Sequence, residues 1–286
     1  MKLALIGVGL IGGSLAAALR AAGAADAVVG FDSDASALQA GRQAGILTDT
    51  ANSAADAARG ADLVVIATPV GAMRATFAEI APALARDAIV TDVGSTKASV
   101  LADARATLGR SFTRFVPAHP IAGGERPGVQ HADGALFRDR HLITTPVADT
   151  DAVVLARVEA LWRVAGAHVQ RMSADEHDRV FAAVSHLPHV LAFALVDMIA
   201  RSPRADACLA LAGAGFRDFT RIAASSPRMW RDICIANRVA LSAELHGYRA
   251  QLEQLQKAID AGDGDALQAC FEAAAAARRT VDPTGK

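Results

Sequence analysis

A glycine-rich turn near the start of the chain constrains the fold more than any other feature of the sequence. The segment GVGLIG, residues 7–12, follows an apolar run at 2–6 and precedes a helix-forming run at 14–22. The next apolar run, AVVGFD, ends at Asp32, which lies 20 positions after Gly12. This order of strand, glycine turn, helix, strand and acid predicts a dinucleotide-binding unit of the Rossmann type.

Each part of the turn has a predicted role in holding a dinucleotide. Gly7 permits the tight turn, Gly9 lets the backbone approach a pyrophosphate, and Gly12 allows the helix to pack closely on the strand. The first helical turn offers free N–H groups and a positive dipole to phosphates. Asp32 can accept hydrogen bonds from an adenosine ribose diol and would repel a 2′-phosphate, so we expect NAD rather than NADP.

Strand-like and helix-like runs alternate up to residue 172. The further strand-like runs are 61–69, 88–95, 114–120, 141–146 and 167–172. Continuous Val/Ile runs separated by helices predict a mainly parallel sheet covered on both faces, which is a doubly wound α/β Rossmann-type domain over residues 1–172.

Ligands bind such sheets beyond the carboxyl ends of the strands. Thr68-Pro69, Gly94-Ser95 and His119-Pro120 all follow strand-like runs, so they should converge near a bound nicotinamide. The predicted cofactor-binding residues are Gly7, Gly9, Leu10, Ile11, Gly12, Asp32, Thr68 and Pro69.

The pattern changes after Met172. Ser173 and Glu176 form a capping box that opens a helix, and only helix-like segments follow. These segments are 174–201, 204–212, 216–223, 228–236, 238–261 and 265–279. We therefore predict an all-α domain over residues 173–286, and by analogy with similar folds we expect it to form a homodimer interface.

Composition excludes several classes of protein. A net charge of −1 argues against nucleic acid as a partner, because neutralising phosphates requires a basic surface. Three widely spaced cysteines suit neither a disulfide framework nor a zinc site, which favours the cytoplasm. The glycines interrupt the N-terminal apolar run, and the longest later run, 190–200, is short and contains Asp197, so no membrane span is expected.

His119 is the leading candidate for proton transfer. A histidine at a strand end on the ligand side can take a hydroxyl proton as hydride leaves its carbon. Ser95 could hydrogen-bond that histidine or the substrate hydroxyl, or it could cap the following helix. Lys97 is most simply interpreted as a solvated lysine in the first turn of that helix.

Residues 177–193 carry three histidines in a mostly apolar run. His177 and His186 are nine residues apart, about half a turn out of phase on a straight helix, which disfavours a shared metal. Pro188 should kink the helix between His186 and His189. Further along, Arg217 and Arg221 share a helical face and could recognise a carboxylate or form a surface salt bridge. The residues alone predict no metal site and leave the roles of the arginines open.

Five segments assemble into a resemblance. GVGLIGGS, DVGSTK, HPIAGGE, HDRVFAAVSHLPH and GFRDFTRIAASSPRMWRDI occur in this order and span residues 2 to about 237. Together they resemble the prephenate and arogenate dehydrogenase family of tyrosine biosynthesis. The resemblance implies an NAD-dependent oxidative decarboxylation of an anionic cyclohexadienol, a helical dimerisation domain, and tyrosine as a candidate feedback inhibitor.

Roles carry over residue by residue. His119 matches the family's catalytic histidine and Ser95 the serine that assists at the reacting hydroxyl. Arg221 matches the arginine that anchors a substrate carboxylate, His189 a histidine facing the substrate, and Glu125 an acid near the pocket entrance. His177 and His186 match histidines that could simply organise the seam between the two domains.

The chain departs from the family at Gly124, where Thr or Ser is common. The substrate pocket therefore lacks a hydroxyl there, and the choice between prephenate and arogenate and inhibition by tyrosine both stay open.

Two alternatives compete with this interpretation. A 3-hydroxyacid-type NAD(P) dehydrogenase would need a lysine in the helical domain as its proton carrier, and only Lys257 lies well within that half. A non-catalytic NAD-binding redox sensor would need no proton acceptor, yet His119, Ser95 and Arg221 are all present.

Overall fold

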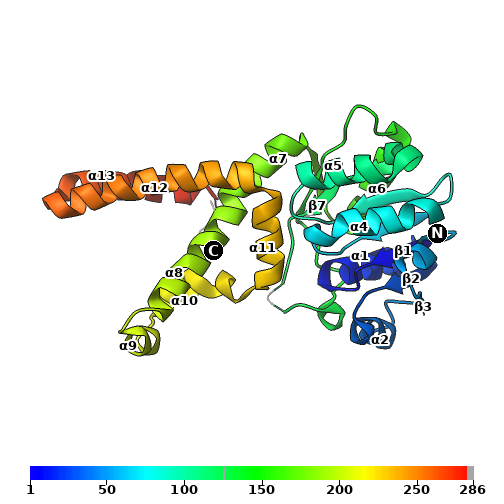
Figure 1. The fold of residues 1–286 in the computed structure, drawn as a ribbon, viewed down its shortest axis with the longest axis horizontal. Coiled ribbons are helices and arrows are strands. Elements are labelled where there is room, and N and C mark those ends of the chain that lie inside the picture. Colours follow the sequence, from blue (N-terminus) through cyan, green and yellow to red (C-terminus); the bar gives the residue numbers. More distant parts are fainter. Residues whose placement is uncertain (125, 282–286) are drawn as a thin grey trace. The chain divides into compact units, whose positions relative to one another are not determined.

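A computed structural model describes residues 1–124 and 126–281 (Figure 1). Contacts divide the chain into two compact units, Met1–Arg238 and Val239–Lys286, which we describe separately. The sequence predicts a domain boundary after residue 172, where alternating strands and helices give way to helices alone. This domain boundary stays a prediction.

A six-stranded parallel sheet forms the centre of the nucleotide-binding half. Its order is β3-β2-β1-β4-β5-β6, and every neighbouring pair is parallel. The strands are β1 (Lys2–Ile6), β2 (Ala27–Phe31), β3 (Asp49–Thr50), β4 (Leu63–Ile66), β5 (Ile89–Asp92) and β6 (Phe115–Val116). The helices between them are α1 (Leu10–Ala21), α2 (Ala35–Gln43), α3 (Ala54–Ala58), α4 (Val70–Ile80) and α5 (Ala98–Thr107), and α6 (Ala152–Val164) comes later in the chain than β6.

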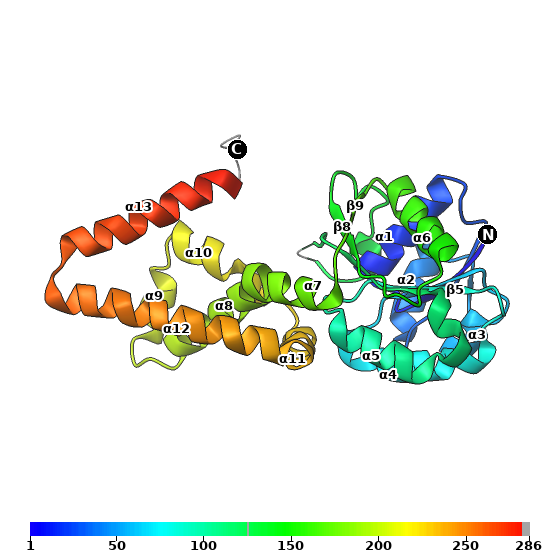
Figure 2. The same cartoon turned by 90° about the horizontal axis from the view of Figure 1, so that it is seen from above.

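Two apolar cores cover the two faces of this sheet. Because successive strand side chains point to opposite faces, Leu3 and Leu5 pack in one core while Ala4 and Ile6 pack in the other. The first core includes side chains of α1 and α6, and the second includes side chains of α3, α4 and α5. Figure 2 shows these two groups of helices on opposite sides of the sheet. The predicted doubly wound α/β fold is confirmed.

A second, three-stranded sheet was not expected. It contains β7 (Ala118–Pro120), β8 (His141–Thr144) and β9 (His168–Arg171), with β7 antiparallel and β9 parallel to β8. The run 114–120 is therefore divided between β6 and β7 rather than forming one strand. Pro117 lies at the division, and since proline has no N–H to donate to a ladder, it favours a break there.

The helical region begins with one continuous helix of mixed type. It consists of α7 (Ala174–Phe181), a π-helical turn (Ala182–His186) and α8 (Leu187–Ala200). The π turn lies just before Pro188, where a regular α-helix would meet the proline ring. An extra residue in a π turn shifts later side chains by about 100°, so His186 lies about 80° rather than about 180° from His177 around the axis. The expectation that these histidines occupy opposite faces is therefore wrong.

Shorter helices complete the first unit, and two long ones form the second. They are α9 (Ala205–Ala210), α10 (Ala214–Thr220), a 3₁₀ turn (Arg221–Ala224), α11 (Pro227–Ala236), α12 (Arg238–Ala261) and α13 (Gly264–Val281). The predicted helical character of this region is confirmed.

The continuous helix Ala174–Ala200 is long and apolar enough to cross a membrane by length and composition alone, with a mean hydropathy of 1.6 in its most apolar window. From the sequence, the longest apolar run expected in this region was 190–200, which is short and contains Asp197. His177, Asp178 and His186 on this helix are buried and hydrogen-bonded within the first unit. Since a lipid-facing helix would leave such groups without partners, we interpret the segment as a helix of the folded protein.

Candidate active site

The glycine turn between β1 and α1 packs tightly at two positions and is open at a third. Gly7 has φ +93°, and a Cβ there would lie 2.6 Å from the Ala67 carbonyl group. A Cβ on Gly12 would lie 2.7 Å from Leu5 and 2.8 Å from Ala67. A Cβ on Gly9, in contrast, would meet no protein atom within 4 Å. The turn is held against the sheet while the space above Gly9 stays open to a ligand.

The surroundings of this turn fit a dinucleotide. Helix α1 has no acidic residue in its first turn, and Gly9 at its N-cap offers no side chain, so its first N–H groups face that open space. Asp32 accepts hydrogen bonds from Val8 N (2.7 Å) and Asp34 N (2.9 Å), which fixes its carboxylate at the end of β2. Thr68, just after β4, has a buried hydroxyl with no partner among the described residues.

Lys97 corrects an expectation drawn from the sequence. It is not a solvated lysine, because its side chain is fully buried. Its ammonium group forms an ion pair with the equally buried Asp92 and donates to the Ala118 carbonyl at 2.7 Å. Asp92 also accepts from Gly94 N (2.8 Å) and Ala118 N (3.1 Å). This pair fixes the backbone immediately before His119.

Ser95 does not cap helix α5. The helix begins at Ala98, and Asp178 of α7 accepts the backbone N–H groups of Lys97 (2.8 Å) and Ala98 (3.0 Å) in place of a local cap. Among the described residues, the Ser95 hydroxyl has no hydrogen bond with His119. Its expected role at a substrate hydroxyl therefore stays a prediction.

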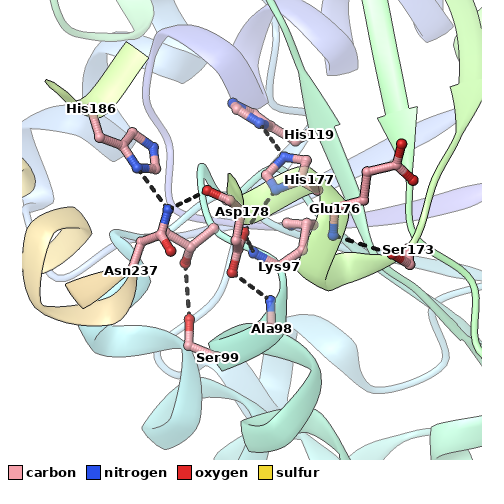
Figure 3. Close-up of polar contacts among 12 residues, drawn as sticks. Lys97, Ala98, Ser99, His119, Ser173, Glu176, His177, Asp178, His186 and Asn237 are labelled. Carbon is pink, nitrogen blue, oxygen red and sulfur yellow. Dashed lines mark hydrogen bonds and ion pairs between the residues drawn. The ribbon is translucent and has the colours of Figure 1, made fainter. Parts of the chain in front are cut away.

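His119, in the middle of β7, is linked to α7 by a short row of hydrogen bonds (Figure 3). His119 Nδ1 lies 2.8 Å from His177 Nε2, and His177 Nδ1 lies 2.8 Å from Asp178 Oδ1. Burial, with smaller contributions from His177, Lys97 and His186, lowers the pKa of His119 well below its ordinary value of 6.5. His119 is therefore neutral near pH 7 and able to accept a proton.

A second row of contacts extends from Asp178 towards α8. Asn237 donates through Nδ2 to the Asp178 carbonyl (2.7 Å) and lies 3.0 Å from His186 Nδ1. Burial lowers the pKa of His186 to about 4. His186 packs edge-on to Trp230, whose ring stacks on His189 with a centroid distance of 3.6 Å. The π turn thus brings all three histidines of this helix into one contiguous cluster with His119.

Arg221 lies beside this cluster. Burial lowers the pKa of His189, and the charge of Arg221 lowers it further, while a hydrogen bond with the Ser185 carbonyl opposes both. His189 and Arg221 are therefore neighbours, and their shared role in binding a substrate stays a prediction. Glu125 lies outside the described residues. Gly124 and Leu10 both line a cavity of about 370 Å³ whose lining includes none of the four clustered histidines.

Sequence reasoning missed the contributions of His177, Asp178 and Lys97. His177 precedes Phe181 by four residues, so the two share a helical face, and that apolar face indicates burial of the histidine. Asp178 accepts a hydrogen bond from the backbone of Lys97, which lies 81 residues earlier in the sequence, and no local sequence pattern predicts such a contact. Among the described residues no group of three or more His, Cys, Asp or Glu side chains could hold a metal ion.

Comparison with known families covers most of the chain. Residues 15–171 match the model described as "Prephenate dehydrogenase, nucleotide-binding domain", and residues 173–273 match "Prephenate dehydrogenase, dimerization domain". The cyclohexadienyl dehydrogenase of Zymomonas mobilis is 38% identical over 96% of this chain and 94% of its own. The prephenate dehydrogenase of Bacillus subtilis is 34% identical over 94% of this chain and 73% of its own.

Solved structures agree with these relatives. A prephenate dehydrogenase of Aquifex aeolicus, in complex with hydroxyphenyl propionate and NAD⁺, superposes with a TM-score of 0.91 at 34% identity and covers 99% of this chain and 98% of its own. An arogenate dehydrogenase of Synechocystis superposes with a TM-score of 0.81 at 27% identity, covering 98% of this chain and all of its own. The chain therefore belongs to the prephenate dehydrogenase family of oxidoreductases.

Proposed function

We propose that this chain catalyses the NAD-dependent oxidative decarboxylation of prephenate to 4-hydroxyphenylpyruvate, of arogenate to tyrosine, or of both. The observation that carries the proposal is a neutral His119 with one ring nitrogen hydrogen-bonded to His177, in a protein whose glycine turn is shaped for a dinucleotide. Membership of the family supplies the reaction class. The structural relative with NAD⁺ bound supports the cofactor.

The fit of the cofactor follows from this chain's own residues. The N–H groups of the first turn of α1, at Leu10, Ile11 and Gly12, would hold the pyrophosphate, and Asp32 would accept from the adenosine ribose. Thr68 and Pro69 would line the nicotinamide side. When bound, NAD⁺ accepts the hydride from the carbon that carries the substrate hydroxyl.

His119 performs the proton transfer in this proposal. It accepts the hydroxyl proton as the carbon–oxygen bond becomes a ketone, and the ketone withdraws electrons from the ring. The ring carboxylate then leaves as CO₂, and the electrons of the broken carbon–carbon bond make the ring aromatic. The resulting phenolate oxygen takes back the proton from His119. Because His119 is neutral near pH 7, it needs no prior loss of a proton.

Arg221 and His189 hold the substrate in register. An arginine can bind a carboxylate through two parallel hydrogen bonds. His189 Nδ1 lies 2.9 Å from the Ser185 carbonyl and donates to it, which leaves Nε2 as the nitrogen free for a substrate. In its neutral form Nε2 accepts a hydrogen bond, so Arg221 rather than His189 would supply the positive charge.

A direct test compares substrates and cofactors. Purified protein is assayed for reduced cofactor with prephenate and with arogenate, each with NAD⁺ and with NADP⁺, in the presence and absence of tyrosine. We expect turnover with NAD⁺ and at least one of the two substrates. Absence of turnover with both substrates, in protein that binds NAD⁺, would overturn the proposal.

The role of His119 is tested by His119→Asn. The expected result is a loss of turnover of at least about 10²-fold, the usual contribution of general base catalysis, with NAD⁺ affinity nearly unchanged. An exposed histidine on β9, changed in His168→Asn, provides the matched control. Activity close to wild type in His119→Asn would remove His119 from the mechanism.

We also infer a homodimer formed through the helical half and a cytoplasmic location. The matched dimerization model supports the dimer. So do large apolar side chains exposed on α8, α12 and α13, namely Met198, Val239, Leu252, Ile259 and Phe271. Light scattering during gel filtration should give twice the chain mass of 29.5 kDa. The three free cysteines suit a reducing compartment.

A further inference from the structure

In the row Asp178–His177–His119, the charge state of Asp178 determines which atom donates and which accepts in each hydrogen bond. The Asp178 carboxylate accepts backbone N–H groups from Lys97 and Ala98 and lies 2.8 Å from His177 Nδ1. Burial alone would raise the pKa of Asp178, but these hydrogen bonds hold it below its ordinary value. An ionised carboxylate only accepts hydrogen bonds, so the shared proton must lie on His177 Nδ1.

The proton on Nδ1 determines the tautomer of His177. His177 is fully buried, and burial lowers its pKa, whereas the hydrogen bond that it donates to Asp178 opposes this shift. A neutral His177 with its proton on Nδ1 presents a lone pair at Nε2. His119 Nδ1 lies 2.8 Å from that lone pair and must therefore donate to it.

His119, the last residue of the row, is then left with a lone pair at Nε2. No described group of the protein hydrogen-bonds to His119 Nε2. Phe181 packs against both imidazoles, with centroid distances of 4.9 Å to His119 and 4.5 Å to His177, and limits their rotation. We propose that Asp178 and His177 are positioning residues that hold His119 in its Nδ1–H tautomer, so that Nε2 accepts the proton of the substrate hydroxyl.

The same row stabilises the charge that His119 acquires. Once Nε2 is protonated, His119 still donates through Nδ1 to His177, and the negative charge of Asp178 lies behind that ring. The other ionisable groups around His119 are Lys97, paired with Asp92, and His186, which is neutral because its pKa is about 4. Asp178 is therefore the one anion hydrogen-bonded to the row among the described residues.

This inference rests on the proposed function, since it concerns the base of that reaction. It can nevertheless be tested without turnover, by long-range ¹H–¹⁵N spectra of histidine-labelled wild-type protein at pH 8, with NAD⁺ bound. The His119 signals are assigned by their absence from His119→Asn. We expect protonated-type ¹⁵N shifts at Nδ1 and unprotonated-type shifts at Nε2. A dominant Nε2–H tautomer, or averaging between the two, would overturn the inference even in a fully active enzyme.

Kinetics of two variants give a second readout. His177→Phe keeps the ring but removes the acceptor, and we expect kcat to fall at least about 10²-fold while KM and NAD⁺ affinity change less than about threefold. His177→Gln offers an amide oxygen near the position of Nε2, and it should recover at least about tenfold of that loss. His168→Phe on the exposed strand β9 is the matched control. Equal activity of His177→Phe and wild type would refute a positioning role, whereas a fold defect would also change KM and NAD⁺ binding.

Discussion

Replacing Lys97 by methionine should destabilise the protein more than most single substitutions. Methionine retains much of the length and apolar character of the lysine stem, so the variant removes the charge without leaving a large cavity. Asp92 would then be an unpaired carboxylate with no exposed surface. Breaking a buried pair by removing one partner costs about 3–5 kcal/mol.

The structure places the expected loss near the lower end of this range. Asp92 would keep its hydrogen bonds from Gly94 N and Ala118 N, which partly compensate the carboxylate. The Ala118 carbonyl would lose its bond from the ammonium group, worth about 1 kcal/mol. We therefore expect the free energy of unfolding to fall by about 3 kcal/mol, out of a typical total of about 5–15 kcal/mol.

Urea unfolding, followed by both tryptophan fluorescence and circular dichroism, measures this loss. Lys257→Met on α12, where the lysine is exposed, should change the free energy of unfolding by less than about 0.5 kcal/mol. Adding Asp92→Asn to Lys97→Met removes the unpaired charge, so the double variant should be more stable than the sum of the single losses predicts. A loss below about 1 kcal/mol in Lys97→Met, or strict additivity, would refute the reasoning.

The site itself carries three further predictions. Arg221→Ala should raise KM for the substrate at least about tenfold with a smaller change in kcat, and steady-state kinetics with an unchanged KM would remove its anchoring role. Gly7→Ala should abolish NAD⁺ binding in calorimetry, because its Cβ would collide with Ala67 at φ +93°. The free energy of unfolding should fall by about 3 kcal/mol between pH 6.5 and pH 4. Over this range His186 binds a proton in the unfolded chain but stays largely neutral in the folded protein, where its pKa is about 4. Urea unfolding at constant ionic strength across this pH range measures the change.

Local periodicity predicted most of the fold. Strands such as β1 and β4 are continuous apolar runs bounded by turn signals, and the glycine turn together with Asp32 identified the nucleotide-binding unit. The second sheet was missed because pairing of β7 with β8 joins residues more than twenty positions apart, and nothing in either segment specifies an antiparallel partner. Pro117 marks the division between β6 and β7 in the sequence, but the run around it is apolar enough to resemble one strand.

The site was predictable where its residues carry a motif and not where they depend on burial. His119, His189 and Arg221 were proposed from motifs, and contacts link His119 and His189 through one cluster, with Arg221 beside it. Lys97 was misassigned because a lysine is almost always exposed, and its burial depends on Asp92 occupying the same interior. The π turn was not predicted either, since Pro188 signals a disturbance of the helix but not how the backbone accommodates it.

The π turn makes chain length, and not only residue identity, a determinant of the active site. Deleting Val184, an exposed residue within the turn, would let the segment close into a regular α-helix. Eight residues of regular α-helix would then separate His177 from the histidine now at 186, and they give the same angle of about 80° as the present nine residues with the π turn. His186 and His189 would therefore stay in the cluster, whereas a regular α-helix that kept Val184 would rotate both by about 100° and remove them from it. Alignments of this family that place a one-residue gap here would therefore mark proteins with a regular helix and the same arrangement of histidines.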